Sequence, residues 1–310
     1  MKNDYLSIIA NKKTKSFVEK CAATILTCCA LVSIFAVVSI TVYMFVAGTP
    51  AIFKVGLKEI LFSPIWAPTA SNPQFGILYV ILTSIVGTLL AVILGVPIGV
   101  LTAIYLSELC HKKVKKILKS CIELLAGIPS VVYGLLGIII INPFMYQVEK
   151  MVFANDPSHQ FTGGANLLSA VFVLTIMILP TLINITETSL ESVPKDYRTS
   201  SLALGATQIQ TIFKVVLPAA KNGIMSAIVL GVGRAIGEAM AILLVAGNSV
   251  NLPLPFHSVR FLTTAIVSEM SYAQGLHREV LFTIGLVLFV FIMIINLILN
   301  YIMKKGDQYE

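Results

Sequence analysis

One polar stretch organises this chain: VPKDYRTSSLALGATQIQTIFKVVLPAA, residues 193–220. It is too polar to lie in lipid, yet it stands between two apolar runs that are each long enough to cross a bilayer. Its apolar residues recur mostly at helical spacing, and Gly205 interrupts them near the middle. We therefore predict two short helices joined at or near Gly205. The second helix should end at the Leu217-Pro218 pair, because a proline disfavours helical backbone at the residue before it.

The composition is that of a membrane protein. Of 310 residues, 57% are hydrophobic and only 12% are charged, which excludes a soluble domain with a single buried core. The net charge is +7, but the basic residues cluster in short loops beside apolar runs, as orientation signals do, and form no basic groove for nucleic acid. The five cysteines lie in or next to apolar runs without a CxxC pair, so we expect free thiols and no metal site.

The apolar runs predict six membrane-spanning helices, and hence an all-α polytopic membrane protein. The predicted spans are residues 21–47, 76–106, 117–141, 167–190, 223–246 and 280–303. Between the first two spans we expect an interfacial or re-entrant segment with Trp66 at the level of the lipid head groups, and residues 259–270 should form a short helix at the membrane surface. The chain divides accordingly into an N-terminal part, residues 1–75, and a permease core, residues 76–306, with the polar loop at about 191–222.

The distribution of basic residues predicts the orientation of the chain. With the N-terminus in the cytosol, the cytosolic segments hold sixteen lysines and arginines and the external segments hold five. This asymmetry follows the positive-inside rule. It places both termini and the Gly205 stretch in the cytosol.

Apart from Lys119 and Glu187 near the ends of the third and fourth spans, the charged residues within the predicted spans are Arg234, Glu238 and Glu123. Arg234 and Glu238 are four residues apart, so we expect them on one helix face. A charge at the bilayer centre costs about 2.5 to 3.5 kcal/mol, whereas an exposed pair at this spacing returns only about 0.3 to 0.5 kcal/mol. We expect Arg234 to meet an anionic substrate in a translocation path, with Glu238 holding it or moderating its field. Glu123, near the cytosolic end of the third span, should gate or brace the inner mouth. The alternatives are a structural pair that locks the fifth span and a structural hydrogen-bond partner at Glu123.

The polar stretch resembles the EAA loop of binding-protein-dependent ABC importer permeases. In that family a glycine follows an acidic-small-small triplet and a Leu-Pro pair follows about a dozen residues later, as Gly205, Leu217 and Pro218 do here. The resemblance implies that the loop docks into a cytosolic ATPase and transmits its closure to the membrane helices. The triplet departs from the pattern, so an acidic contact is missing or supplied elsewhere. An ordinary amphipathic connector is the alternative. The residues expected at the contact are Thr199, Ser200 and Ser201 in place of the triplet, then Leu202, Ala203, Gly205, Ala206, Leu217 and Pro218.

Longer runs resemble the PstC family of phosphate-specific permeases. They cover most of the chain from about Trp66 and read FGILYVILTSIVGTLL, GVPIGVLTAIYLSE, ELLAGIPSVVYGLLG, SLALGAT and GRAIGEAMA. The resemblance implies a type I ABC importer permease (MetI-like) fold in the bacterial cytoplasmic membrane and import of inorganic phosphate. It also implies a sister permease (PstA-like), an ATPase dimer (PstB-like) and an external phosphate-binding protein (PstS-like). In that family an arginine and a glutamate associated with phosphate transport fall on Arg234 and Glu238.

Other classes of protein fit less well. No GxxxxGK[ST] loop occurs, so we expect a non-catalytic subunit that binds no cofactor and leaves ATP to its partner ATPase. A permease for sulfate, molybdate or another oxyanion would keep the Gly205 stretch and differ in the pore. A secondary transporter would show an inverted repeat or a chain of intramembrane acids, and neither is found. An intramembrane enzyme would need a nucleophile and a base within the spans, yet all four histidines lie outside them.

Overall fold

The structure is a computed structural model that describes the backbone of residues 2–307 and the side chains of residues 19–301. The structure therefore does not describe the side chains of the terminal lysines outside residues 19–301, which were included in the count of basic residues. The helices are α1 (Lys2–Val55), α2 (Leu57–Phe62), α3 (Leu78–Ile104), α4 (Lys112–Gly127), α5 (Ser130–Leu136), α6 (Asn142–Val152), α7 (Leu167–Glu191), α8 (Lys195–Ala203), α9 (Gln208–Thr211), α10 (Leu217–Ala219), α11 (Lys221–Gly237), α12 (Met240–Val245), α13 (Leu262–Glu269) and α14 (Gly275–Asp307). Three π-helical turns interrupt them: η1 (Tyr105–Leu109), η2 (Gly137–Ile141) and η3 (Ile212–Val216). A small antiparallel hairpin pairs β1 (Trp66–Ala67) with β2 (Gln74–Phe75).

Within the described part of the chain, five helical stretches are long and apolar enough to cross a membrane. They are Glu19–Val55, Leu78–Leu109, Ser130–Val152, Leu167–Glu191 and Gly275–Tyr301. A sixth candidate is the pair Gln208–Ala219 and Lys221–Gly237, which passes only as one span bent by 69°. The prediction of an all-α polytopic membrane protein is confirmed.

The core lies where α3, α7, α11 and α12 pack together, and α7 is the most buried of the candidate spans. Glycines allow the close approach of α3 to α7. A Cβ on Gly95 would lie 2.7 Å from Ile178 Cδ1, and one on Gly99 would lie 2.9 Å from Leu182 Cβ. Small residues at such contacts let helix backbones approach, and any larger side chain would force the two helices apart.

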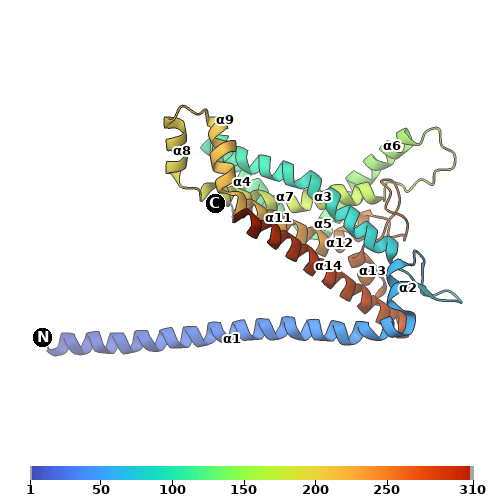
Figure 1. The fold of residues 1–310 in the computed structure, drawn as a ribbon, viewed down its shortest axis with the longest axis horizontal. Helices are drawn as coiled ribbons and strands as arrows, with labels where there is room; N and C mark the ends of the chain where they lie inside the picture. Colours follow the sequence, from blue (N-terminus) through green and yellow to red (C-terminus); the bar gives the residue numbers. More distant parts are fainter. Residues whose placement is uncertain (1, 308–310) are drawn as a thin grey trace.

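The two ends of the helical bundle carry different elements (Figure 1). Helices α4, α8 and α9 gather at one end, which we call the α8 end, and α2, α6 and the hairpin lie at the other, the α6 end. Helix α1 touches the bundle mainly near its last turns, where Thr283 Oγ1 donates to the Gly48 carbonyl at 2.7 Å. Farther toward its N-terminus α1 diverges from α14, and Phe35 is 74% exposed. The rest of the bundle therefore holds together without most of α1.

The third span is displaced from its predicted position. Residues 117–141 were expected to span, but α4 ends at Gly127 and the candidate span begins at Ser130 and runs to Val152. Pro129 separates the two helices, because proline has no N–H to continue the helical hydrogen bonds. None of the sixteen residues of α4, all of them described, is buried. Its lysines on one face make it amphipathic, and α6 supplies the apolar length that α4 lacks.

Candidate functional site

Helices α8 and α9 meet in a corner at Gly205. Gly205 has φ +86°, in the left-handed region that glycine adopts without strain. The next helix starts with a capping box, in which Thr207 Oγ1 accepts from Gln210 N at 3.2 Å and Gln210 Oε1 accepts from Thr207 N at 2.9 Å. The predicted pair of short helices joined at Gly205 is confirmed.

The predicted end of the second helix at Leu217-Pro218 is wrong. Leu217 keeps helical backbone, with φ −63° and ψ −46°, and the helix continues to Ala219 before the 69° bend into α11. The π-helical turn η3 lies directly before Pro218, and in it Leu217 N donates to the carbonyl five residues back, that of Ile212. The wider turn makes room for a proline ring that has no N–H to donate. The corner therefore leads without a loop into the bent span.

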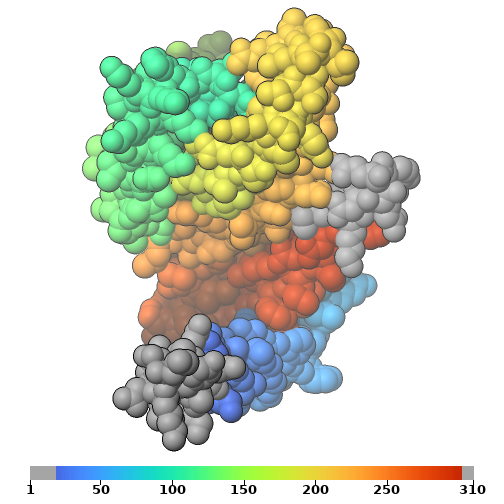
Figure 2. Space-filling view, turned by 90° about the vertical axis from the view of Figure 1, so that its left-hand side faces the viewer, coloured from blue at the N-terminus to red at the C-terminus, as the bar shows by residue number. Residues whose placement is uncertain are grey.

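The residues predicted to contact the ATPase lie in or next to this corner, which stands at the top of Figure 2. Ser201, Ala206 and Leu217 are half-buried, and the exposed ones are Thr199, Ser200, Leu202, Ala203, Gly205 and Pro218. Leu204, between the helices, is 89% exposed. A hollow of about 480 Å³ beside it lies between α8 and η3 and is lined in part by Ser200, Ser201 and Leu204. Leu202, Ile209 and Phe213 of the same corner are exposed as well, and several exposed apolar side chains in one segment are typical of a contact surface.

A hydroxyl pair stabilises the corner from inside. Ser201 Oγ lies 2.9 Å from Oγ1 of the buried Thr211. Changing Ser201→Ala leaves the Thr211 hydroxyl unpaired and should cost about 1 kcal/mol of local stability. Amide hydrogen exchange in α8 should then quicken about fivefold. Ser200→Ala is the matched control, since that exposed hydroxyl makes no hydrogen bond within the described residues; equal exchange in the two variants would contradict the prediction.

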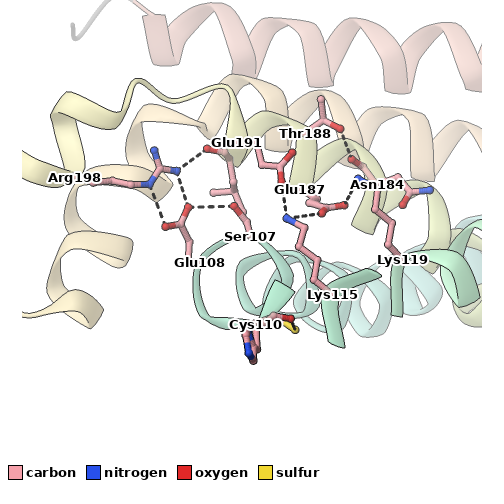
Figure 3. Close-up of polar contacts among 12 residues, drawn as sticks. Ser107, Glu108, Cys110, Lys115, Lys119, Asn184, Glu187, Thr188, Glu191 and Arg198 are labelled. Carbon is pink, nitrogen blue, oxygen red and sulfur yellow. Dashed lines mark hydrogen bonds and ion pairs between the residues drawn. The ribbon is translucent and has the colours of Figure 1, made fainter. Parts of the chain in front are cut away.

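Arg198 ties the corner to two membrane helices (Figure 3). Its Nε and Nη2 donate to the two carboxylate oxygens of Glu108 in η1 at 3.1 and 2.6 Å. Its Nη1 and Nη2 also donate at 2.8 Å to the carbonyls of Val193 and Leu190, at and beyond the end of α7. The hydrogen bond to Glu108 raises the pKa of the Arg198 guanidinium above its ordinary value against the smaller, opposite effect of burial, so this side chain stays charged.

Lysines of α4 hold a buried carboxylate of α7 at the same end (Figure 3). Glu187 is fully buried, and Nζ of Lys115 and of Lys119 lie 3.0 and 3.2 Å from its two oxygens. Lys115 Nζ also lies 2.5 Å from Glu191 Oε1. These four residues were not singled out from the sequence. Their spacing in the sequence could have identified them, because the two lysines are four residues apart, as are the two glutamates, so that each pair shares a helix face.

The structure separates Glu238 from Arg234. Helix α11 ends at Gly237, and Glu238 has extended backbone with φ −72° and ψ 131°. Its Oε1 accepts from Ala241 N at 2.8 Å at the start of α12, and its carbonyl accepts from Thr263 Oγ1 at 2.6 Å. The prediction that the two charges share a helix face is wrong, because the carboxylate fixes a break in the helix that the sequence pattern did not reveal.

Arg234 lies in the bent span without a carboxylate partner among the described residues. Its Nη1 donates to Thr181 Oγ1 of α7 at 3.1 Å, and the side chain is half-buried. A guanidinium has five N–H donors in a planar fork, so most of them remain available. Such a group binds the oxygens of an anion well.

Glu123 is not brought to this position. It lies on the exposed surface of α4, outside the candidate spans, and within the described residues it makes no hydrogen bond or ion pair to Arg234 or Glu238. The predicted grouping of three charges therefore reduces to one arginine in a span.

Two buried carboxylates organise the α6 end. Glu149 accepts from His159 Nε2 at 2.9 Å and from Thr162 N at 3.0 Å. Glu269 accepts from Trp66 Nε1 at 3.1 Å and from His277 Nε2 at 2.7 Å, and it pairs with Arg260. Trp66, predicted as a head-group anchor, is thus part of a buried network. Helix α13, predicted as a short helix, carries Glu269. Trp66 lies 203 residues from Glu269, and the other partners lie 8 to 13 residues from their glutamate without a helical spacing that would predict the contact.

The model of the family described as binding-protein-dependent transport system inner membrane component matches residues 95–307. The chain belongs to this family. The matched residues include the Gly205 corner, the bent span and Arg234. This permease is a multi-pass membrane subunit of an ABC transporter and is not itself an enzyme, because ATP is hydrolysed by a partner ATPase.

Individual relatives support the same family assignment. The permease is 37% identical over 303 residues to the probable ABC transporter permease protein YqgH of Bacillus subtilis, a match that covers 96% of this chain and 95% of the relative. It is 32% identical over 279 residues to the phosphate transport system permease protein PstC of Mesorhizobium japonicum, with 86% and 84% covered. The fold resembles that of the MetNI methionine ABC transporter in inward facing conformations, with a TM-score of 0.51, 19% identity, and 74% of this chain and 94% of that chain covered. The predicted fold and the relationship to the PstC family are confirmed.

Proposed function

We propose that this permease is the subunit of an ATP-driven importer of inorganic phosphate in which the anion passes Arg234. The observation that carries the proposal is the lone guanidinium in the bent span, which has a hydroxyl partner but no neutralising carboxylate among the described residues. A cation in a membrane is costly unless it serves a path for ions or substrate. The relatives named as phosphate transport permeases favour phosphate among the oxyanions.

In the proposed mechanism the corner receives the motion of the ATPase. The α8 end and both termini lie in the cytosol, and an ATPase dimer contacts the corner through the surface from Thr199 to Ala206, with Leu217 and Pro218 behind it. Since the corner runs into α11 through one 69° bend, displacing it displaces Arg234. The exposed Leu204 and the hydroxyls of Thr199 and Ser200 replace the usual acidic contact.

A sister permease completes the path, and an external phosphate-binding protein docks at the α6 end. Glu238 positions the break between α11 and α12 next to Arg234. Glu123 braces the inner mouth from the exposed face of α4. Residues 76–306 form the permease core, and residues 1–75 precede it.

The test is uptake of labelled phosphate at low micromolar concentration in cells that lack their own system and express the whole complex. We expect uptake that stops when ATP is depleted and persists in excess sulfate. If sulfate competes fully, the substrate is another oxyanion. If uptake continues without ATP, and no ATPase copurifies with the permease, the importer proposal is overturned.

A further inference from the structure

Residue Glu108 is held by both helices of the corner. Its carboxylate accepts two hydrogen bonds from the guanidinium of Arg198 in α8. Its backbone carbonyl accepts a third from Gln208 Nε2 of α9 at 3.2 Å. Glu108 belongs to η1, the π-helical turn that ends the long α3 span, where Cys110 N donates to the Tyr105 carbonyl at 2.8 Å. The end of α3 is therefore attached to both α8 and α9.

Arg198 makes the same kind of attachment to α7. Its two hydrogen bonds to the carbonyls of Leu190 and Val193 join it to the last turn of α7 and to the short segment between α7 and α8. One side chain thus joins α8, α3 and α7 at a single point. The carbonyls at a helix C-terminus carry partial negative charge, so a cation there is bound favourably in addition to the ion pair.

The pair is better placed to transmit force than a surface ion pair. The side chains of Arg198 and Glu108 are 21% and 10% exposed, whereas those of Lys54 and Glu279, paired at the α6 end, are 54% and 29% exposed. Two parallel N–H···O bonds fix the relative orientation of guanidinium and carboxylate, which a single lysine contact does not. Exposed pairs, by contrast, contribute little because water and salt screen them.

We propose that Arg198 and Glu108 form the joint through which the corner moves α3 and α7, so that ATP hydrolysis is coupled to anion movement through this ion pair. The inference rests on the proposed function and adds to it two positioning residues. Without the pair, Ile212 and Val216 of η3 still pack against Leu106 and Leu190. Helix α8, however, then keeps only the short covalent link of residues 192–194 to α7, and its motion is absorbed there. ATP hydrolysis then continues while less of each ATPase closure reaches the spans.

The experiment compares ATP hydrolysed with phosphate imported, in proteoliposomes that hold the whole complex and its binding protein. The variants are Arg198→Ala, Arg198→Lys and Glu108→Gln. The control is Lys119→Ala, which breaks an ion pair between α4 and α7 outside the corner and leaves Glu187 paired with Lys115. We expect the ratio of ATP to phosphate to rise about tenfold in Arg198→Ala, within the usual range of a single coupling free energy. Arg198→Lys, which keeps the charge and loses the fork, should restore part of the coupling, and Lys119→Ala should keep the wild-type ratio.

The ratio separates a coupling role from a purely structural one. If hydrolysis and import fall together so that the ratio stays at the wild-type value, or if Arg198→Ala and Glu108→Gln both lose the ATPase on purification, the joint is overturned. If Arg198→Ala fails to fold, Glu108→Gln still decides, since it keeps the size of the side chain. Wild-type complex that shows no ATP-dependent phosphate uptake refutes the proposed function, a result distinct from a normal ratio in the variants.

Discussion

Arg234→Ala should abolish phosphate uptake in a complex that still assembles. The variant removes the one guanidinium that the bent span offers to an anion, together with its hydrogen bond to Thr181. Each hydrogen bond that involves a charged group is worth about 1.5 to 3 kcal/mol. If the anion loses two such bonds from the guanidinium, uptake should fall about 100-fold or more. Uptake of labelled phosphate, normalised to the amount of complex in the membrane, measures the effect.

Two further variants define what Arg234 does. Arg234→Lys keeps the positive charge but loses the planar fork, so we expect intermediate uptake. Thr181→Val is the matched control, because it removes the neighbouring hydroxyl and leaves the guanidinium in place. Normal uptake in Arg234→Ala would show that the arginine is structural, and the proposed anion path would then have to lie elsewhere.

Gly164→Ala should destabilise the permease more than the addition of a methyl group at Gly95 or Gly99. Gly164 has φ +84°, and a Cβ there would lie 1.8 Å from the carbonyl oxygen of Asn142, at the start of α6. Backbone cannot yield as a flexible side chain can, so the loop and α6 must separate. We expect a loss of about 4 kcal/mol or more, at the upper end of single-residue effects. The thermal unfolding midpoint in detergent measures it.

The neighbouring glycine is the control. Gly163 has φ +67°, but a Cβ added there would meet nothing within 4 Å. Gly163→Ala therefore carries only the strain of left-handed backbone, about 1 to 2 kcal/mol. If the two variants unfold at the same temperature, the close contact between Gly164 and Asn142 does not exist in the protein.

Features that depend on local sequence were predicted well. The corner follows from helical spacing interrupted by Gly205, and four spans follow from apolar runs without interruption, with ends that differ from the predicted ones by several residues. These signals are local, because hydrophobic length and glycine conformation are properties of neighbouring residues. The displacement of the third span is also local in origin, because Pro129 and the spacing of the lysines in α4 can both be read from the sequence.

Features that depend on contacts across the fold were missed. Arg198 and Glu108 are 90 residues apart, and nothing in either segment identifies the other as its partner. Glu187 can be buried because two lysines of α4 form ion pairs with its carboxylate, and a hydropathy pattern does not predict such pairs. The break at Glu238 belongs to the same class. Its capping bond to Ala241 is local, but its carbonyl is held by Thr263 of a distant segment, which stabilises an extended residue inside an apolar run.

The π-helical turns have a consequence for how the spans can move. Each holds one residue more than an α-helical turn, and η1, η2 and η3 each lie within a candidate span or the bent pair. Shifting such a turn along its helix by one position exchanges one hydrogen bond at a time and rotates the residue it passes by about 100° about the helix axis. A span can thereby present a new set of side chains to its surroundings while its axis stays where it is. The π-helical turns thus make the register of a helix, as well as its tilt, available as a coordinate of motion.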